Sequence, residues 1–196
     1  MKSKNIAVVL LAAGSSSRLG QPKQDLLFEG DTLFNNALAA AIEATNHVVV
    51  VLGSWEPWKE IESSVHVIVN DNWEDGMGSS IAIGMKECQR LMPGIDAVIF
   101  MVCDQPYLTA DVLNGLIEKF NESSAPIVVS EYDGTVGTPA LFKSVIFAEL
   151  ANLHGDGGAK SIIAKYESDT VTVPFVKGGI DIDTTKDLMS IINLYQ

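Results

Sequence analysis

Cysteine and long apolar segments are scarce in this 196-residue chain. The two cysteines, Cys88 and Cys103, lie far apart and show no spacing typical of a metal or redox site. Small secreted domains usually carry several paired cysteines, so we expect two buried free thiols and a cytoplasmic protein. No apolar run approaches the ~20 residues that a helix needs to span a bilayer, so the sequence contains no candidate transmembrane helix.

Positive charge is also scarce, because 13 Lys and Arg residues face 25 Asp and Glu residues and leave a formal net charge of −12. The negative field of such a chain opposes binding to nucleic acid and to anionic membranes. An anionic small molecule would need local help from a few cations, helix N-termini or a divalent metal. With 47% hydrophobic residues and no internal repeat or linker, residues 1–196 are expected to form one globular domain.

Short β-branched apolar runs alternate with helix-like segments along the chain. This alternation is typical of an α/β fold with three layers, α/β/α, in which helices cover both faces of a mostly parallel sheet. We expect strands at residues 6–11, 47–52, 65–69, 97–102, 126–130 and 170–175. We expect helices at residues 32–44, 79–91, 110–121, 144–150, 159–166 and 185–194.

A glycine-containing loop, LAAGSSSRLGQPK at residues 11–23, follows the first predicted strand. Gly14 and Gly20 let the backbone approach a ligand, and Arg18 and Lys23 supply positive charge, so the loop suits a polyphosphate. It matches neither the G-x-x-x-x-G-K-[ST] loop of ATPases nor the dinucleotide fingerprint G-x-G-x-x-G.

The same N-terminus has an alternative interpretation as a secretory signal peptide. Lys2 and Lys4 precede the apolar residues 6–13, and small residues follow. However, this apolar core is near the short end for a signal peptide, and the cysteine content is not that of a secreted domain. We therefore favour a strand followed by a phosphate-binding loop.

A second glycine-containing stretch, NDNWEDGMGSSIAIGM at residues 70–85, follows the third predicted strand. Gly76 and the serines open an amphipathic helix, whose free N–H groups could hold an anion or the edge of a base. Ser79 or Ser80 could equally be a simple N-cap, with Trp73 a surface residue.

Acidic residues follow the fourth predicted strand and precede the last predicted helix. Asp104, directly after a nearly continuous apolar run, is well placed to hold a hard cation such as Mg²⁺, although an aspartate before a proline-containing turn is also a common Asx-turn residue. Asp181 and Asp183 stand at positions i and i+2, which project to one face of extended backbone. One of them could turn toward Asp104 as a second metal ligand, or both could simply give a helix an acidic start.

These motifs, in this order, resemble those of the molybdenum-cofactor nucleotidyltransferase-like family. Residues 14–23 resemble its G-x-x-x-R-[LM]-G-x-x-K signature, residues 70–81 its N-x-x-W-x-x-G-M-x-S-S-[IL] element, VCDQP its D-x-P metal motif, and residues 181–188 its D-[IV]-[DN]-T-P-E-D-L element. The resemblance implies a Rossmann-like fold of the nucleotide-diphospho-sugar transferase type. It also implies a nucleotide site formed by Leu11, Ala12, Ala13, Gly14, Lys23, Asn70, Gly76, Met77, Ser79, Ser80 and Asp104.

Two further segments are similar to elements that face the second substrate in this family. VGTPALF at residues 136–142 resembles G-[HNT]-P-x-[LF]-F, and HGDGGAK at residues 154–160 resembles G-D-x-G-A-[RK]. Both could equally be ordinary turns between elements. The residues that the resemblance places near the acceptor are Gln105, Pro106, Gly137, Thr138, Pro139, Gly155, Asp156, Gly158 and Lys160.

The activity implied by the resemblance is nucleotidyl transfer, in which an acceptor phosphate attacks the α-phosphorus of a nucleoside triphosphate and pyrophosphate leaves. Arg18 and Lys23 would offset the charge of the triphosphate. Mg²⁺ or Mn²⁺ held by Asp104 and Asp183, with Asp181 as the second choice, would bridge the α-phosphate and the attacking oxygen. Arg18, Lys23 and Asp104 are therefore the predicted catalytic residues.

The nucleotide and the acceptor follow from finer details of the resemblance. LAAG is typical of the family's cytidylyltransferases and LAGG of its guanylyltransferases, and a Cβ at Ala13 could crowd a purine, so CTP is favoured. The implied acceptor is the phosphate of molybdopterin in the molybdenum cofactor, with a molybdoenzyme as a possible client. A sugar or polyol phosphate acceptor and a non-catalytic nucleotide-binding chaperone are the alternatives. Asp25, where the family usually has Leu, either pairs with Lys23 or faces solvent.

Overall fold

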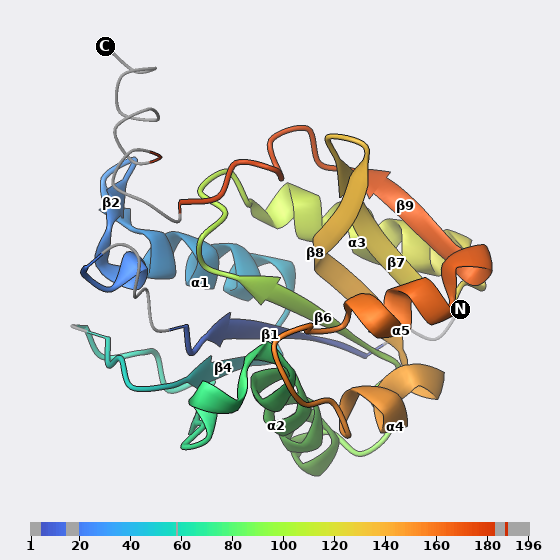
Figure 1. Ribbon diagram of the computed structural model, residues 1–196, viewed down its shortest axis with the longest axis horizontal. Coiled ribbons are helices and arrows are strands. Elements are labelled where there is room, and N and C mark those ends of the chain that lie inside the picture. The colour runs from blue at the N-terminus through green and yellow to red at the C-terminus, as the bar shows by residue number, and fades with distance from the viewer. Residues whose placement is uncertain (1–4, 15–19, 58, 183–186, 188–196) are drawn as a thin grey trace.

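The computed structural model describes residues 5–14, 20–57, 59–182 and 187, and it has the predicted three-layer α/β/α architecture (Figure 1). Its central sheet has seven strands in the order β5-β4-β1-β6-β8-β7-β9. These strands are β1 (Ile6–Ala12), β4 (Val48–Leu52), β5 (His66–Val69), β6 (Ala97–Val102), β7 (Ile127–Tyr132), β8 (Thr135–Lys143) and β9 (Thr170–Pro174). A separate two-stranded hairpin consists of β2 (Leu27–Phe28) and β3 (Asp31–Thr32).

Helices cover both faces of the sheet. On one face α1 and α3 lie side by side, and on the other α2 packs with α4, which Figure 1 shows above and below the sheet. The helices are α1 (Leu33–Ala44), α2 (Met77–Leu91), α3 (Ala110–Glu122), α4 (Phe147–Leu150) and α5 (Lys160–Lys165). Shorter 3-10 turns are η1 (Lys23–Asp25), η2 (Trp73–Asp75), η3 (Ser144–Ile146) and η4 (Glu167–Asp169).

The centre of the sheet explains the continuous apolar runs of the sequence. β1 pairs in parallel with both β4 and β6, and all seven residues of β1 are buried. Strands covered on both faces have no solvent side, so they lose the polar alternation of an exposed sheet. The central position of β1 confirms the predicted strand and does not fit the alternative interpretation of this stretch as a signal peptide.

One strand was missed by the sequence analysis. β8 lies between β6 and β7 and is antiparallel to both, whereas residues 136–142 were interpreted only as a substrate-facing segment. The turn before β8 is made by Asp133 and Gly134, with φ of 51° and 73°, which suits a two-residue hairpin turn. An Asp-Gly pair between two apolar runs is a known hairpin signal, so this antiparallel insertion was open to prediction.

Most other predicted boundaries hold within one or two residues. α2 begins at Met77 rather than at residue 79, and the predicted helix at 144–150 is divided into η3 and α4. The helix predicted at residues 185–194 falls outside the described residues, apart from position 187. Within the described chain, no helix is both long enough and apolar enough to cross a membrane.

The tight packing of α2 on the sheet depends on Gly84. A Cβ built there would lie 2.8 Å from Val9 Cγ1 and 3.1 Å from Val51 Cγ2. We therefore expect Gly84→Ala to lower the free energy of unfolding by about 1–3 kcal/mol, the usual cost of overpacking a core. In α3 the same change is easy, because a Cβ at Gly115 meets its nearest atom, Val173 Cγ1, at 3.5 Å.

Gly115→Ala is accordingly the matched control, and we expect it to raise stability by up to about 1 kcal/mol, because alanine is the better helix former. Urea unfolding followed by circular dichroism measures both values. Equal stability of the two variants would contradict the close approach of α2 to β1 and β4.

Candidate active site

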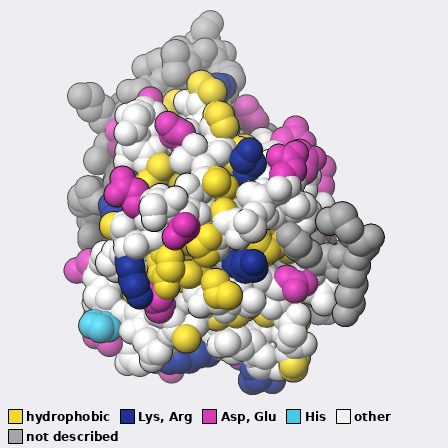
Figure 2. Space-filling view, turned by 90° about the vertical axis from the view of Figure 1, so that its right-hand side faces the viewer, with side chains coloured by type: hydrophobic (Ala, Val, Ile, Leu, Met, Phe, Trp, Pro, Cys, Tyr) yellow, Lys and Arg dark blue, Asp and Glu magenta, His cyan; other side chains and the backbone are white. Residues whose placement is uncertain are grey.

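A cavity of about 370 Å³ lies at the carboxyl ends of β1 and β6. The opposite side of the molecule, seen in Figure 2, mixes acidic, basic and hydrophobic side chains without a dominant patch of one charge. Of the predicted nucleotide residues, Asn70 and Ser79 do not line the cavity. The others do: Leu11, Ala12, Ala13, Gly14, Lys23, Gly76, Met77, Ser80 and Asp104.

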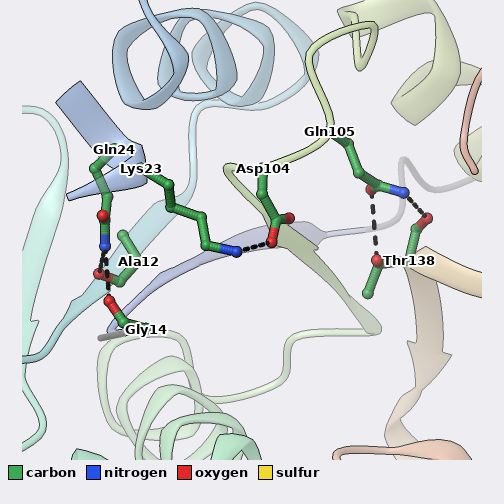
Figure 3. Close-up of polar contacts among 7 residues, drawn as sticks. All are labelled: Ala12, Gly14, Lys23, Gln24, Asp104, Gln105 and Thr138. Atoms are coloured by element: carbon green, nitrogen blue, oxygen red, sulfur yellow. Dashed lines mark hydrogen bonds and ion pairs between the residues drawn. The ribbon is translucent and has the colours of Figure 1, made fainter. Parts of the chain in front are cut away.

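The central feature of this cavity is a contact between Lys23 and Asp104. Lys23 Nζ lies 2.6 Å from Asp104 Oδ2, and the two side chains are 16% and 21% exposed. Figure 3 shows them pointing toward one another from η1 and from the turn after β6. They are 81 residues apart in sequence and meet because β1 and β6 are adjacent parallel strands that end at the same edge. Both were predicted as catalytic residues, but their direct pairing was not.

Gln24 fixes the backbone at the start of the glycine loop. Its side chain is only 1% exposed, and its Nε2 donates to the carbonyls of Ala12 (3.0 Å) and Gly14 (3.1 Å) (Figure 3). The two carbonyls flank Ala13, so this amide holds the main chain that lines the cavity. Sequence reasoning missed Gln24, because one glutamine beside a lysine has no local signature. Arg18, the other predicted cation, lies outside the described residues.

Asn70 and Ser79 do not line the cavity but hold the loop before α2 by hydrogen bonds. Asn70 is buried, and its Nδ2 donates to Ser79 Oγ (2.8 Å) and Ser80 Oγ (3.0 Å). Ser79 Oγ in turn donates to the carbonyl of Gly76 (2.8 Å). Gly76, with φ of 91°, is the residue before α2, so the alternative that one of the two serines is the N-cap is wrong.

The segment that contains Asp181 is joined to the turn after β6 by a backbone hydrogen bond at the neighbouring residue. Ile182 N donates to the backbone carbonyl of Asp104 at 3.0 Å. Burial raises the pKa of Tyr132, and the negative charges of Asp181 and Asp104 add to this rise. No group of three metal-ligating side chains occurs among the residues with described positions. Asp183, the preferred second ligand, falls outside them.

Two carboxylates nevertheless fit the needs of a divalent cation at a phosphate site. Mg²⁺ is usually held by one or two carboxylates, with waters and substrate phosphates completing its six oxygen ligands. Asp104 supplies such oxygens in the cavity wall, and Asp181 precedes Ile182, whose backbone N–H binds the Asp104 carbonyl. The donor set is therefore suited to a metal that arrives with a nucleotide.

A polar cluster lies on the other side of Asp104. Gln105 is 4% exposed, and its Nε2 donates to the carbonyl of Thr138 (3.1 Å), which Figure 3 shows, and to that of Gly178 (2.8 Å). The Thr138–Pro139 peptide bond is cis, and a Cβ at Gly137 would collide with the Tyr132 hydroxyl. Gln105 thus joins the predicted acceptor residues of β8 to the segment that leads to Asp181.

The turn at residues 154–158 packs against the start of α2. Gly78 N donates to the carbonyl of Gly155 at 2.8 Å, and a Cβ at Gly158 would lie 2.9 Å from Met77 Sδ. This turn places Asp156 in the wall of the same cavity as Ala13 and Lys23. Its proximity to the nucleotide loop was not predicted. Lys160 is exposed at the first position of α5, and Pro106 is buried in the turn after β6.

The remaining expectations concern the cysteines and Asp25. Cys88 and Cys103 are free and buried, as predicted, and burial raises the pKa of each thiol to about 12. Cys103 lines the cavity, but its thiol stays protonated and is a poor nucleophile. Asp25 accepts a hydrogen bond from Trp55 Nε1 at 3.1 Å, so the interpretation of Asp25 as a purely solvent-facing residue is wrong.

Fold and site together define a nucleotidyltransferase: a mostly parallel α/β sheet with a glycine loop, a cation and a carboxylate at one cavity. The chain belongs to the family described as the MobA-like NTP transferase domain, whose sequence model matches residues 8–171.

The chain is also similar to individual proteins of known sequence or structure. It is 31% identical to the purine catabolism protein PucB of Bacillus subtilis (strain 168), over 83% of this chain and 82% of PucB. It is 25% identical to nicotine blue oxidoreductase of Paenarthrobacter nicotinovorans, over 94% and 95% of the two chains.

Among solved structures, Rv0371c of Mycobacterium tuberculosis H37Rv superposes with a TM-score of 0.84 at 28% identity, covering 98% of this chain and 100% of Rv0371c. A second structure of Rv0371c, a complex with manganese, superposes with a TM-score of 0.74 at 24% identity over 97% and 99% of the chains.

Proposed function

We propose that this protein transfers CMP from CTP to the phosphate of molybdopterin in the molybdenum cofactor and releases pyrophosphate. The observation that carries the proposal is the contact between Lys23 and Asp104 in the wall of the cavity beside the glycine loop. A cation and a metal-binding carboxylate at one point are what a triphosphate with its divalent metal requires.

In the proposed reaction an oxygen of the acceptor phosphate attacks the α-phosphorus of CTP. The new P–O bond forms as the bond from the α-phosphorus to the bridging oxygen of the β-phosphate breaks, and pyrophosphate leaves with that electron pair. The protein has little covalent work to do, because the gain comes from orientation and from neutralising charge. Lys23 would bind phosphate oxygens, and Arg18, outside the described residues, would assist it.

Mg²⁺ or Mn²⁺ is the proposed metal. Asp104 and Asp183, the latter outside the described residues, would hold it, with Asp181 as the second choice, and the bound ion would supply positive charge to the reacting phosphates. The solved manganese complex of the similar Rv0371c supports a divalent metal in this family.

The preference for CTP over purine nucleotides is assigned to Ala13. Ala13 lines the cavity, and its main chain lies close to Gly53, where a Cβ would approach the Ala13 carbonyl to 2.7 Å. A methyl group at position 13, in place of the hydrogen of a glycine, would narrow the space for a base. A purine needs more of that space than a pyrimidine does.

The choice of molybdopterin as the acceptor rests on family membership, and a sugar phosphate or polyol phosphate is the alternative acceptor. The cluster of Gln105, Thr138 and Tyr132 beside Asp104 is the proposed acceptor side of the site. A client molybdoenzyme would receive the product. A non-catalytic chaperone would bind CTP without transfer, which the intact pair of Lys23 and Asp104 disfavours.

Pyrophosphate release by the purified protein tests this function. Each of the four ribonucleoside triphosphates is supplied with Mg²⁺, with and without molybdenum cofactor, and we expect release only when CTP and the cofactor are both present. Chelation of the metal with EDTA should abolish release, and added Mg²⁺ or Mn²⁺ should restore it.

Other outcomes would overturn parts of the proposal separately. Release with CTP and a sugar phosphate, but not with the cofactor, would replace the acceptor. Saturable CTP binding without release on any acceptor would replace transfer by a chaperone role.

A further inference from the structure

A Cβ at Ala13 separates pyrimidines from purines, but it does not separate CTP from UTP. The two rings have the same size and differ at position 4, where cytosine carries an amino donor and uracil a carbonyl acceptor. A carboxylate is the side chain that accepts from the cytosine amino group and repels the uracil oxygen. The cavity must therefore present an acceptor to the base if the protein is selective for CTP.

The charges around the cavity indicate where the base lies. Lys23 and Asp104 occupy the wall formed by η1 and the turn after β6, and two more carboxylates, Glu74 and Asp156, occupy the wall beside the start of α2. A triphosphate is attracted to the first wall, where a cation and the proposed metal lie, and is repelled by the second. The nucleoside end of CTP is thus directed toward Glu74 and Asp156.

Asp156 is the better placed of these two carboxylates, because its turn is docked on α2. Gly78 N holds the carbonyl of Gly155, and Cβ atoms at Gly76 or Gly78 would collide with Asp156 and His154. The absence of a side chain at Gly76 and Gly78 therefore leaves room for the turn at residues 154–158. Glu74 lies on the 3-10 turn η2, and both carboxylates are exposed.

We propose that the carboxylate of Asp156 accepts a hydrogen bond from the exocyclic amino group of the bound cytosine and thereby selects CTP over UTP. This inference rests on the proposed function and deepens it: Ala13 excludes purines, and Asp156 excludes the second pyrimidine. The selection lies in binding and needs no acceptor substrate to be measured.

Calorimetric titration with CTP and with UTP, each with Mg²⁺, tests the assignment in the wild type and in Asp156→Asn. An asparagine amide can serve either base, so we expect the CTP preference to fall at least about tenfold, the value of one charged hydrogen bond. Asp156→Ala should weaken CTP binding by a similar factor and strengthen UTP binding, because the carboxylate that repels the uracil oxygen is gone. Asp169→Asn, an exposed change of the same charge on η4, should alter neither affinity.

Three results would overturn the inference while leaving nucleotidyl transfer intact: an unchanged preference in Asp156→Asn, equal binding of CTP and UTP by the wild type, or loss of the preference in Glu74→Gln alone. Failure of the wild type to bind any triphosphate would remove the proposed function as well. Thermal unfolding of each variant confirms that the compared proteins are folded.

Discussion

Asp104→Ala is expected to lower the turnover of pyrophosphate release by about 10²–10³-fold or more, the range seen when one preorganised charged group is removed from an active site. The reason is twofold. Asp104 is the proposed metal ligand at the end of β6, and its carboxylate also holds Lys23 at 2.6 Å. Both the metal and the cation would lose their position together.

The stability of this variant should stay close to that of the wild type. The Lys23–Asp104 side chains are still 16% and 21% exposed, so solvent can reach the unpaired lysine, and the loss should be smaller than the ~3–5 kcal/mol of a fully buried pair that loses one partner. The melting temperature measured by calorimetry beside the kinetic assay separates the two effects. A large drop in melting temperature with little change in turnover would make the pair a structural ion pair only.

Metal dependence makes this test specific to the proposed role. In Asp104→Asn the shape is kept and the charge is lost, so the Mg²⁺ or Mn²⁺ concentration for half-maximal turnover should rise well above the wild-type value. Asp111→Asn, an exposed change of the same charge in the first turn of α3, should match the wild type. A well-folded Asp104→Ala protein with near-normal turnover would remove Asp104 from the mechanism.

The sequence was most informative where local composition and tertiary position coincide. β1, β4 and β6 are continuously apolar because they are covered on both faces, and their carboxyl ends meet, so the loops after β1 and β6 were expected at one site. The family motifs added residue identities that composition alone left open, such as Lys23 and Asp104.

The sequence was least informative where packing decides. β8 was missed because Gly137 and Pro139 interrupt its apolar pattern, although it lies inside the sheet. Asp25 contacts Trp55 through one hydrogen bond, and Asp156 approaches the start of α2 because Gly76 has no Cβ. Both contacts join segments that are distant in sequence. No local sequence pattern predicts such contacts, although they determine which side chains lie around the cavity.

Lys23→Ala is expected to lower turnover by about 10²-fold or more and to raise the KM for CTP. The variant loses a phosphate-binding cation from a cavity whose other charged lining residues, among those with described positions, are all acidic. This effect differs in kind from that of Asp104→Asn. The metal concentration for half-maximal turnover should change little, because Asp104 and the other proposed metal ligands are all retained. Kinetics at varied CTP and varied Mg²⁺ therefore distinguish the two residues.

Lys119→Ala removes an exposed lysine of α3 that pairs with Glu122, and it serves as the control for the loss of one positive charge. The double variant Lys23→Ala with Asp104→Ala completes a cycle. Because the two side chains touch, the double variant should lose little more turnover than Asp104→Ala alone, since removing Asp104 already releases the lysine. Fully multiplicative losses, or a Lys23→Ala protein with normal KM and turnover, would show that the contact does not organise the phosphate site.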